Sequence, residues 1–155
     1  MSFTISKKEK HFLLHFTALF FLSFAILKAL PLQPLNSLVA FSQDKMLSAA
    51  GFSVLRQGPM LVVGSSAFEM VVDCSGLVMT VMFLALLYAT KTKIPLRKTL
   101  AYMVFFLAFN LLRLSFTLAT GAVYGQGVLD VVHPALWFVD SGVVFACWAK
   151  EYGLW

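Results

Sequence analysis

Charged residues are scarce in this chain of 155 residues. They make up 12% of the sequence, whereas hydrophobic residues make up 60%. In soluble domains about a quarter of the residues are charged, and a soluble core of this size could not cover so much apolar surface. The scarcity of charge therefore excludes an ordinary soluble domain and indicates that the lipid bilayer is the solvent.

Cysteine is also scarce, with 2 residues in the whole chain. Because there is no C-x-x-C pair, a membrane thiol oxidoreductase is disfavoured. Cys74 stands at the outer end of one apolar run, whereas Cys147 lies near the inner end of another. A disulfide needs Cα atoms within about 7 Å, so we expect the two not to pair, and we interpret Cys147 as an apolar filler.

The basic residues exclude one class of partner. The chain has 12 lysines and arginines against 7 acidic residues, a formal net charge of +5. A nucleic-acid-binding protein would gather them on a polar face, but here they lie at the ends of apolar runs, so we expect no nucleic-acid partner. His11 and His15 have an i, i+4 spacing, but apart from Glu9 no carboxylate or cysteine near them completes a metal site. No metal or cofactor is expected.

Four long apolar runs predict an all-α polytopic membrane protein. Each is long enough, or nearly so, to cross a hydrocarbon core of about 30 Å. The first run ends in "ILKALPLQ", which lacks a small-x-small cleavage site, so we expect a retained helix rather than a cleaved signal peptide. No internal repeat or soluble appendage is evident, and residues 1–155 are expected to form a single membrane domain. The expected helices cover about residues 12–30, 75–90, 98–120 and 131–149.

The outer segment 31–73 has a different character. Apolar residues near helical spacing in "LNSLVAFSQDKMLSAAG" predict a small helix that lies in the membrane interface. The stretch "GFSVLRQGPMLVVGSSAFEMVVD" is rich in Val, Phe and Leu around a Gln57-Gly58-Pro59 turn. It predicts a β-hairpin, with Phe68–Val72 as a strand that leads into Cys74. Between the last two runs, "GAVYGQGVLD" predicts a Gly-rich loop.

The basic residues also predict orientation. Most of them precede the first run, fill the connection between the second and third, or follow the fourth, so that four spans place all of these segments on one side. By the positive-inside rule that side is the cytoplasm, and both termini lie there. The cytoplasmic set is Lys7, Lys8, Lys10, Lys91, Lys93, Arg97, Lys98 and Lys150, against Lys45 and Arg56 outside.

Three polar residues on different segments then fall at one depth near the outer surface. Cys74 heads the second run, Arg113 lies roughly 10 Å below the outer end of the third at 1.5 Å per residue, and His133 opens the fourth. Asn110 shares a helix face with Arg113. An arginine inside a span is costly and is usually functional or paired, and Asp140, also within a span, is a candidate partner.

These residue types suit nucleophilic catalysis. Cys74 supplies a thiolate, and in the first turn of a helix the positive end of the helix dipole would lower its pKa. His133 would take and return the proton, and Arg113 would stabilise an oxyanion or hold a substrate carbonyl. The negative charge of Asp73 would disfavour formation of the Cys74 thiolate, unless Arg113 or another cation neutralises the Asp73 carboxylate.

A non-enzymatic hypothesis stays open from the same residues. The protein would then be a small membrane assembly or channel-like protein, with Asn110, Arg113 and Asp140 as intramembrane polar contacts or as the lining of a polar path. Cys74 would be a small apolar filler. The two hypotheses differ in whether function depends on thiol chemistry.

Three short motifs carry a resemblance. "CSG" (Cys74-Ser75-Gly76) heads a membrane helix, "NLLR" (Asn110–Arg113) lies in the next helix, and a histidine opens the one after that. This order, with the outer hairpin before the cysteine, resembles the exosortase/archaeosortase family of membrane cysteine transpeptidases. The resemblance covers roughly residues 51–149.

The resemblance implies that the protein acts on exported proteins with a C-terminal sorting signal, which comprises a short motif, a transmembrane helix and a basic tail. Cleavage would occur at the outer face of the cytoplasmic (inner) membrane through a Cys acyl-enzyme, which water or a lipid or glycan acceptor resolves. Cys74 would be the nucleophile, Arg113 the oxyanion-binding or substrate-orienting residue, and His133 the general acid/base. The supporting residues would be Asn110, Ser75 and Gly76. Archaeosortases carry Arg where His133 stands, so the bacterial exosortase type fits better.

The chain departs from many family members in length. Those members have about eight spans, whereas this chain has about four and looks like the catalytic core alone. Recognition of the substrate helix would then come from a homo-oligomer or from the groove of the core itself.

Overall fold

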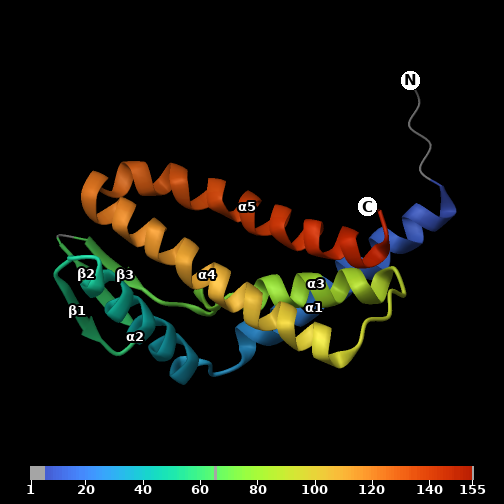
Figure 1. The fold of residues 1–155 in the computed structure, drawn as a ribbon, viewed down its shortest axis with the longest axis horizontal. Helices are drawn as coiled ribbons and strands as arrows, with labels where there is room; N and C mark the ends of the chain where they lie inside the picture. Colours follow the sequence, from blue (N-terminus) through green and yellow to red (C-terminus); the bar gives the residue numbers. More distant parts are fainter. Residues whose placement is uncertain (1–5, 65, 155) are drawn as a thin grey trace.

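Long helices form most of the molecule, whose structure is a computed structural model that describes residues 6–64 and 66–154. Four of them lie roughly lengthwise, and a small sheet with one further helix gathers at one end (Figure 1). The lengthwise helices are α1 (Lys7–Ala29), α3 (Leu77–Ala89), α4 (Leu96–Tyr124) and α5 (Gln126–Tyr152). The apolar runs predict these helices, although not all of their ends.

Three helices of the described residues, α1, α4 and α5, are long and apolar enough to cross a membrane. The expected second span corresponds to α3, which is apolar but has 13 residues. A helix needs about 20 residues to cross the hydrocarbon core. By length, the structure therefore supports three of the expected spans and makes the second a shorter apolar helix.

The first helix begins with a capping box. The Ser6 hydroxyl accepts a hydrogen bond from the Glu9 N–H, and the Glu9 carboxylate accepts one from the Ser6 N–H. The helix stops shortly before Pro31, which disfavours helical backbone in the residue preceding it. None of the residues Lys7–Ala29 is buried, and α1 packs mainly against α3. An apolar helix with so little buried surface suits a lipid-facing position.

The outer segment folds as one helix and a three-stranded sheet. Helix α2 (Gln33–Ala49) lies where the sequence predicts a helix. Strands β1 (Val54–Gln57), β2 (Met60–Val63) and β3 (Ser66–Glu69) pair antiparallel in the order β1-β2-β3. The predicted hairpin is thus present, with a third strand added to it.

The predicted strand Phe68–Val72 is wrong at its C-terminal end. Strand β3 stops short, and a 3₁₀ helix, η1 (Val72–Ser75), follows it. The Ser75 hydroxyl donates a 2.6 Å hydrogen bond to the Val72 carbonyl. Local side-chain bonds of this kind compete with strand pairing for the backbone groups, so Cys74 lies on a turn.

The predicted loop "GAVYGQGVLD" is also wrong, because Gly125 alone separates α4 from α5. Gly125 has a φ of +81°, a conformation that favours glycine. Gly121 stays helical and allows β3 to pack closely, since a Cβ at this position would lie 3.1 Å from Cζ of Phe68. The glycine at 121 therefore serves close packing and not a turn.

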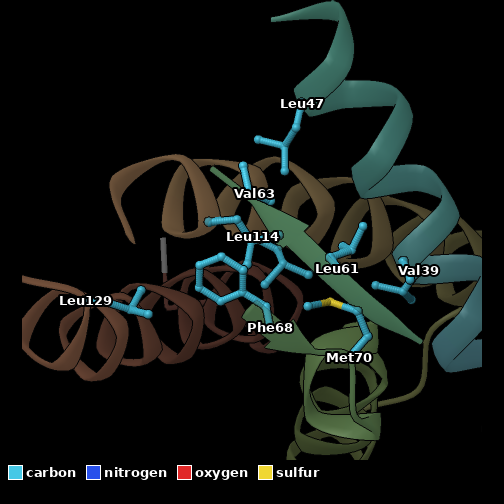
Figure 2. Packing of buried hydrophobic residues seen from close by; sticks show 10 residues of the cluster. Val39, Leu47, Leu61, Val63, Phe68, Met70, Leu114 and Leu129 are labelled. Atoms are coloured by element: carbon cyan, nitrogen blue, oxygen red, sulfur yellow. The ribbon is translucent and has the colours of Figure 1, made fainter. Parts of the chain in front are cut away.

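Two apolar clusters hold the elements together. The outer cluster joins α2, the sheet and α4, and Figure 2 shows Val63 and Phe68 of the sheet gathered with Leu114 of α4. The inner cluster joins α3, α4 and α5 around Phe83 and Phe106. The sheet is thereby fixed to the outer half of the helices.

The two cysteines belong to different clusters. Cys74 packs against the outer cluster, and Cys147 packs against the inner one. Both thiols are free. Cys147 thus has the surroundings of a packing residue, whereas Cys74 lies beside the sheet and the η1 turn.

We predict that Gly121→Val lowers the free energy of unfolding by about 1–3 kcal/mol, because the added methyl groups overpack the contact between α4 and the Phe68 ring. Thermal unfolding in detergent measures the change. Gly142→Val is the matched control, since Gly142 is also helical and a Cβ there meets nothing within 4 Å. Equal melting temperatures for the two variants would contradict the close packing at Gly121.

Candidate functional site

Cys74 lies on the η1 turn between the sheet and α3. Its N–H donates a 2.8 Å hydrogen bond to the Val71 carbonyl, and the Leu77 N–H donates a 3.3 Å bond to the Ser75 hydroxyl. The prediction that Cys74 occupies the first turn of a membrane helix is therefore wrong, because α3 begins only at Leu77. The expected lowering of its pKa by the α3 dipole loses its basis.

Gly76 allows the turn to approach α4. Its φ is +76°, and an added Cβ would lie 3.0 Å from the Cβ of Asn110. This close approach lets the Asn110 amide donate a 2.7 Å hydrogen bond to the Cys74 carbonyl. Gly76 and Asn110, predicted as supporting residues, thus hold the backbone of Cys74 against α4.

Behind Asn110 lies a buried ionic network. Arg113 Nη2 donates a 3.1 Å hydrogen bond to Asn110 Oδ1, and Arg113 Nη1 lies 3.4 Å from Asp140 Oδ2 of α5. The side chains of Arg113 and Asp140 are 4% and 14% exposed. The prediction of Asp140 as an intramembrane partner is confirmed, and α5, α4 and the Cys74 turn are connected through polar side chains.

Cys74 and His133 line one cavity of about 410 Å³ between β3, η1, α4 and α5. Its polar lining residues are Glu69, Cys74, Thr117, Gln126, Asp130 and His133. The structure thus brings two of the three predicted site residues, Cys74 and His133, to a shared space. Arg113 lies behind the turn, in the ionic network, and not among the residues that line this cavity.

Burial is the main influence on the Cys74 thiol and raises its pKa, because a thiolate is poorly solvated there. A backbone hydrogen bond between Val71 and the thiol, together with the cations Arg113 and Lys28, acts in the opposite direction, while the Asp73 carboxylate raises the pKa further. In the absence of substrate the neutral thiol is therefore the favoured form at neutral pH. A base beside the sulfur is needed to remove its proton.

Sequence reasoning missed one residue of the site. The sequence patterns assign Lys28 no role in the site, but its Nζ lies 2.6 Å from Asp73 Oδ2. A signal was present in the sequence, because Lys28 ends the first apolar run and Asp73 precedes the second. The first and second apolar runs form antiparallel helices joined by the segment 31–73, so the end of the first and the start of the second lie at the same level.

A second, largely apolar groove of about 500 Å³ lies on the other side of Asn110. Aromatic residues of α1 and α5 face Val78 and Met82 of α3 across it, and Asp73, Asn110 and Asp140 line it where it meets the ionic network. Among the residues that the structure describes, no group of three or more His, Cys, Asp or Glu side chains could hold a metal ion.

Comparison with known protein families gives a match over most of the chain. A family model described as "Transmembrane exosortase (Exosortase_EpsH)" matches residues 6–149. Searches of curated proteins and of solved structures gave no match. The matched range includes every residue of the site described above.

We predict that Asp140→Ala lowers the free energy of unfolding by about 3–5 kcal/mol, because it leaves the buried Arg113 guanidinium without its counter-charge. Thermal unfolding in detergent is the measurement. Asp130→Ala is the matched control on the same helix: Asp130 is exposed and hydrogen-bonded to Gln126, and its loss should change stability by less than about 0.5 kcal/mol. Equal effects of the two variants would show that the Arg113–Asp140 pair contributes nothing.

Proposed function

This chain belongs to the transmembrane exosortase family, and from that membership we propose that it is a membrane cysteine peptidase or transpeptidase. Its substrates are exported proteins with a C-terminal sorting signal made of a short motif, a transmembrane helix and a basic tail. The observation that carries the proposal is the cavity shared by Cys74 and His133. A nucleophile and a base that face the same space are what acyl transfer requires.

In the proposed reaction His133 removes the proton from the Cys74 thiol as the sulfur attacks the scissile carbonyl. The C–N bond then breaks, and the same proton passes from His133 to the leaving amine. A thioester remains on Cys74. Water or the nucleophile of a lipid or glycan acceptor attacks this thioester, gives its proton to His133, and releases the thiol again.

Arg113 acts on Cys74 from the side of the η1 turn that faces away from the cavity. Its hydrogen bond to Asn110, which in turn holds the Cys74 carbonyl, supports a role in orienting the nucleophile. Its charge also favours negative charge on the sulfur and on an oxyanion formed next to it. Direct contact with substrate would require the guanidinium to leave Asp140.

The positions of the charges support an outward-facing site in the cytoplasmic membrane. The start of α1, the α3–α4 connection and the end of α5 lie at the end of the molecule away from the sheet (Figure 1). These segments carry most of the basic residues, so the positive-inside rule places them in the cytoplasm and the Cys74 cavity outside. The apolar groove beside α1, α3 and α5 is the part of this core that suits the substrate's membrane helix.

We expect Cys74→Ala and Cys74→Ser to lower cleavage of a motif–helix–basic-tail substrate by about 10³-fold or more, since no other group supplies the thiolate. The measurement is the mass of the substrate's mature C-terminus after co-expression. Cys147→Ala is the control and should process normally. Normal processing by Cys74→Ala would instead favour the non-enzymatic membrane protein, in which the Arg113–Asp140 network is purely structural.

His133→Ala should lower the rate of cleavage by about 10²–10⁴-fold, the usual loss when a general base is removed. Iodoacetamide labelling of Cys74 in the same variant checks that the thiol is still present and accessible. His15→Ala is the control, because His15 lies on α1 and, within residues 6–64 and 66–154, its ring bonds only to the His11 carbonyl. If His133→Ala cleaved as fast as His15→Ala, His133 would not be the base.

A further inference from the structure

Asp73 poses an electrostatic problem for its neighbour. It directly precedes the proposed nucleophile, and its carboxylate raises the pKa of the Cys74 thiol. The side chain is 22% exposed, and within the described residues its buried Oδ1 has no hydrogen-bond partner. A carboxylate so poorly solvated would oppose thiolate formation strongly if it carried its charge uncompensated.

The compensating cation comes from a distant helix. Lys28 lies in the last turn of α1, and its Nζ is 2.6 Å from Asp73 Oδ2. The same ammonium group lies 5.4 Å from the centroid of the Phe24 ring, close enough for a cation–π contact. The ion pair thus places the Lys28 ammonium group beside the turn, and Phe24 supports the side chain from the same helix, although Lys28 is 44% exposed.

The other charged groups near Cys74 cannot do the same for Asp73. Arg113 of α4 is committed to Asp140 and Asn110. The remaining titratable groups of the Cys74 cavity are Glu69 of β3 with Asp130 and His133 of α5. Glu69 and Asp130 are acids, and His133 is the proposed base, so Lys28 is the cation that pairs with Asp73.

We propose that Lys28 is a positioning residue of the site: it neutralises Asp73 and holds its carboxylate toward α1, so that Cys74 can ionise when it attacks. Helix α1 then contributes a side chain that tunes the proposed catalytic centre, in addition to anchoring the chain in the membrane. This inference rests on the proposed role of Cys74 as nucleophile, but thiol reactivity tests it without any cleavage assay.

The test is a double-mutant cycle in the full chain with Cys147→Ala, which leaves Cys74 as the single thiol. The rate of alkylation by iodoacetamide, followed by intact mass from pH 6.5 to 9.5, reports the thiolate fraction. The variants are Lys28→Met, Asp73→Asn and the double variant. Lys45→Met is the control, because Lys45 is an outer lysine that stacks on Phe41 and faces no group of the site.

We expect Lys28→Met to slow alkylation at pH 8 by roughly three- to tenfold and to move the rate profile to higher pH. Asp73→Asn should speed alkylation, and Lys28→Met should slow it less in the Asp73→Asn background, where only the direct attraction between the ammonium group and the thiolate is lost. Lys28→Arg keeps the cation and should match the starting protein, as should Lys45→Met.

The inference is overturned if Lys28→Met leaves the pH profile of alkylation unchanged. It is also overturned if Lys28→Met slows alkylation by the same factor whether residue 73 is Asp or Asn. The second result would show that Lys28 acts on the thiol directly or through access to it, and not by neutralising Asp73. A chain that shows the expected cycle but cleaves no sorting signal would refute the proposed function alone. A chain that cleaves normally but shows no coupling would refute the role of Lys28 alone.

Discussion

A guanidinium buried between membrane helices constrains the residues around it. Arg113 is 7% exposed, and leaving such a charge unpaired in apolar surroundings costs several kcal/mol. The structure meets this requirement with Asp140 from α5 and Asn110 from the preceding turn of α4. Asn110 accepts from Arg113 through its side-chain oxygen, and its side-chain amide N–H donates a hydrogen bond to the Cys74 carbonyl. The position of Cys74 is thus linked to the pairing of one buried cation.

The site has two sides with different tasks. On one side, Cys74 and His133 line a shared cavity. On the other side, ion pairs involving Lys28 and Arg113 hold the turn that carries the thiol. Because burial makes the thiol reluctant to ionise, the nearby charges matter more here than they would in water. The three helices long enough to cross a membrane, α1, α4 and α5, each contribute a side chain to one of these two sides, and α3 follows directly from the turn.

Much of this arrangement could be predicted from the sequence, and the failures have identifiable physical causes. The apolar runs predict α1, α4 and α5, and the order of Cys74, Arg113 and His133 along the chain predicts the family that the comparison confirms. The loop expected around Gly121 is absent, because that glycine is required by the Phe68 ring and not by a turn. Contacts of this kind depend on tertiary packing that local patterns do not encode. The ion pair of Lys28 with Asp73 was missed for the same reason, since it joins residues far apart in the chain.

The shortness of α3 has a consequence for the position of the Cys74 thiol. Its 13 residues span about 20 Å at 1.5 Å per residue, roughly 10 Å less than the hydrocarbon core of a typical bilayer. A helix of this length within a bilayer creates a hydrophobic mismatch, which membranes relieve by local thinning or by letting the short helix end below the surface. Because Cys74 lies on the turn that precedes α3, the length of this helix limits how far the sulfur can lie from the other end of α3, independently of the residues that the helix carries.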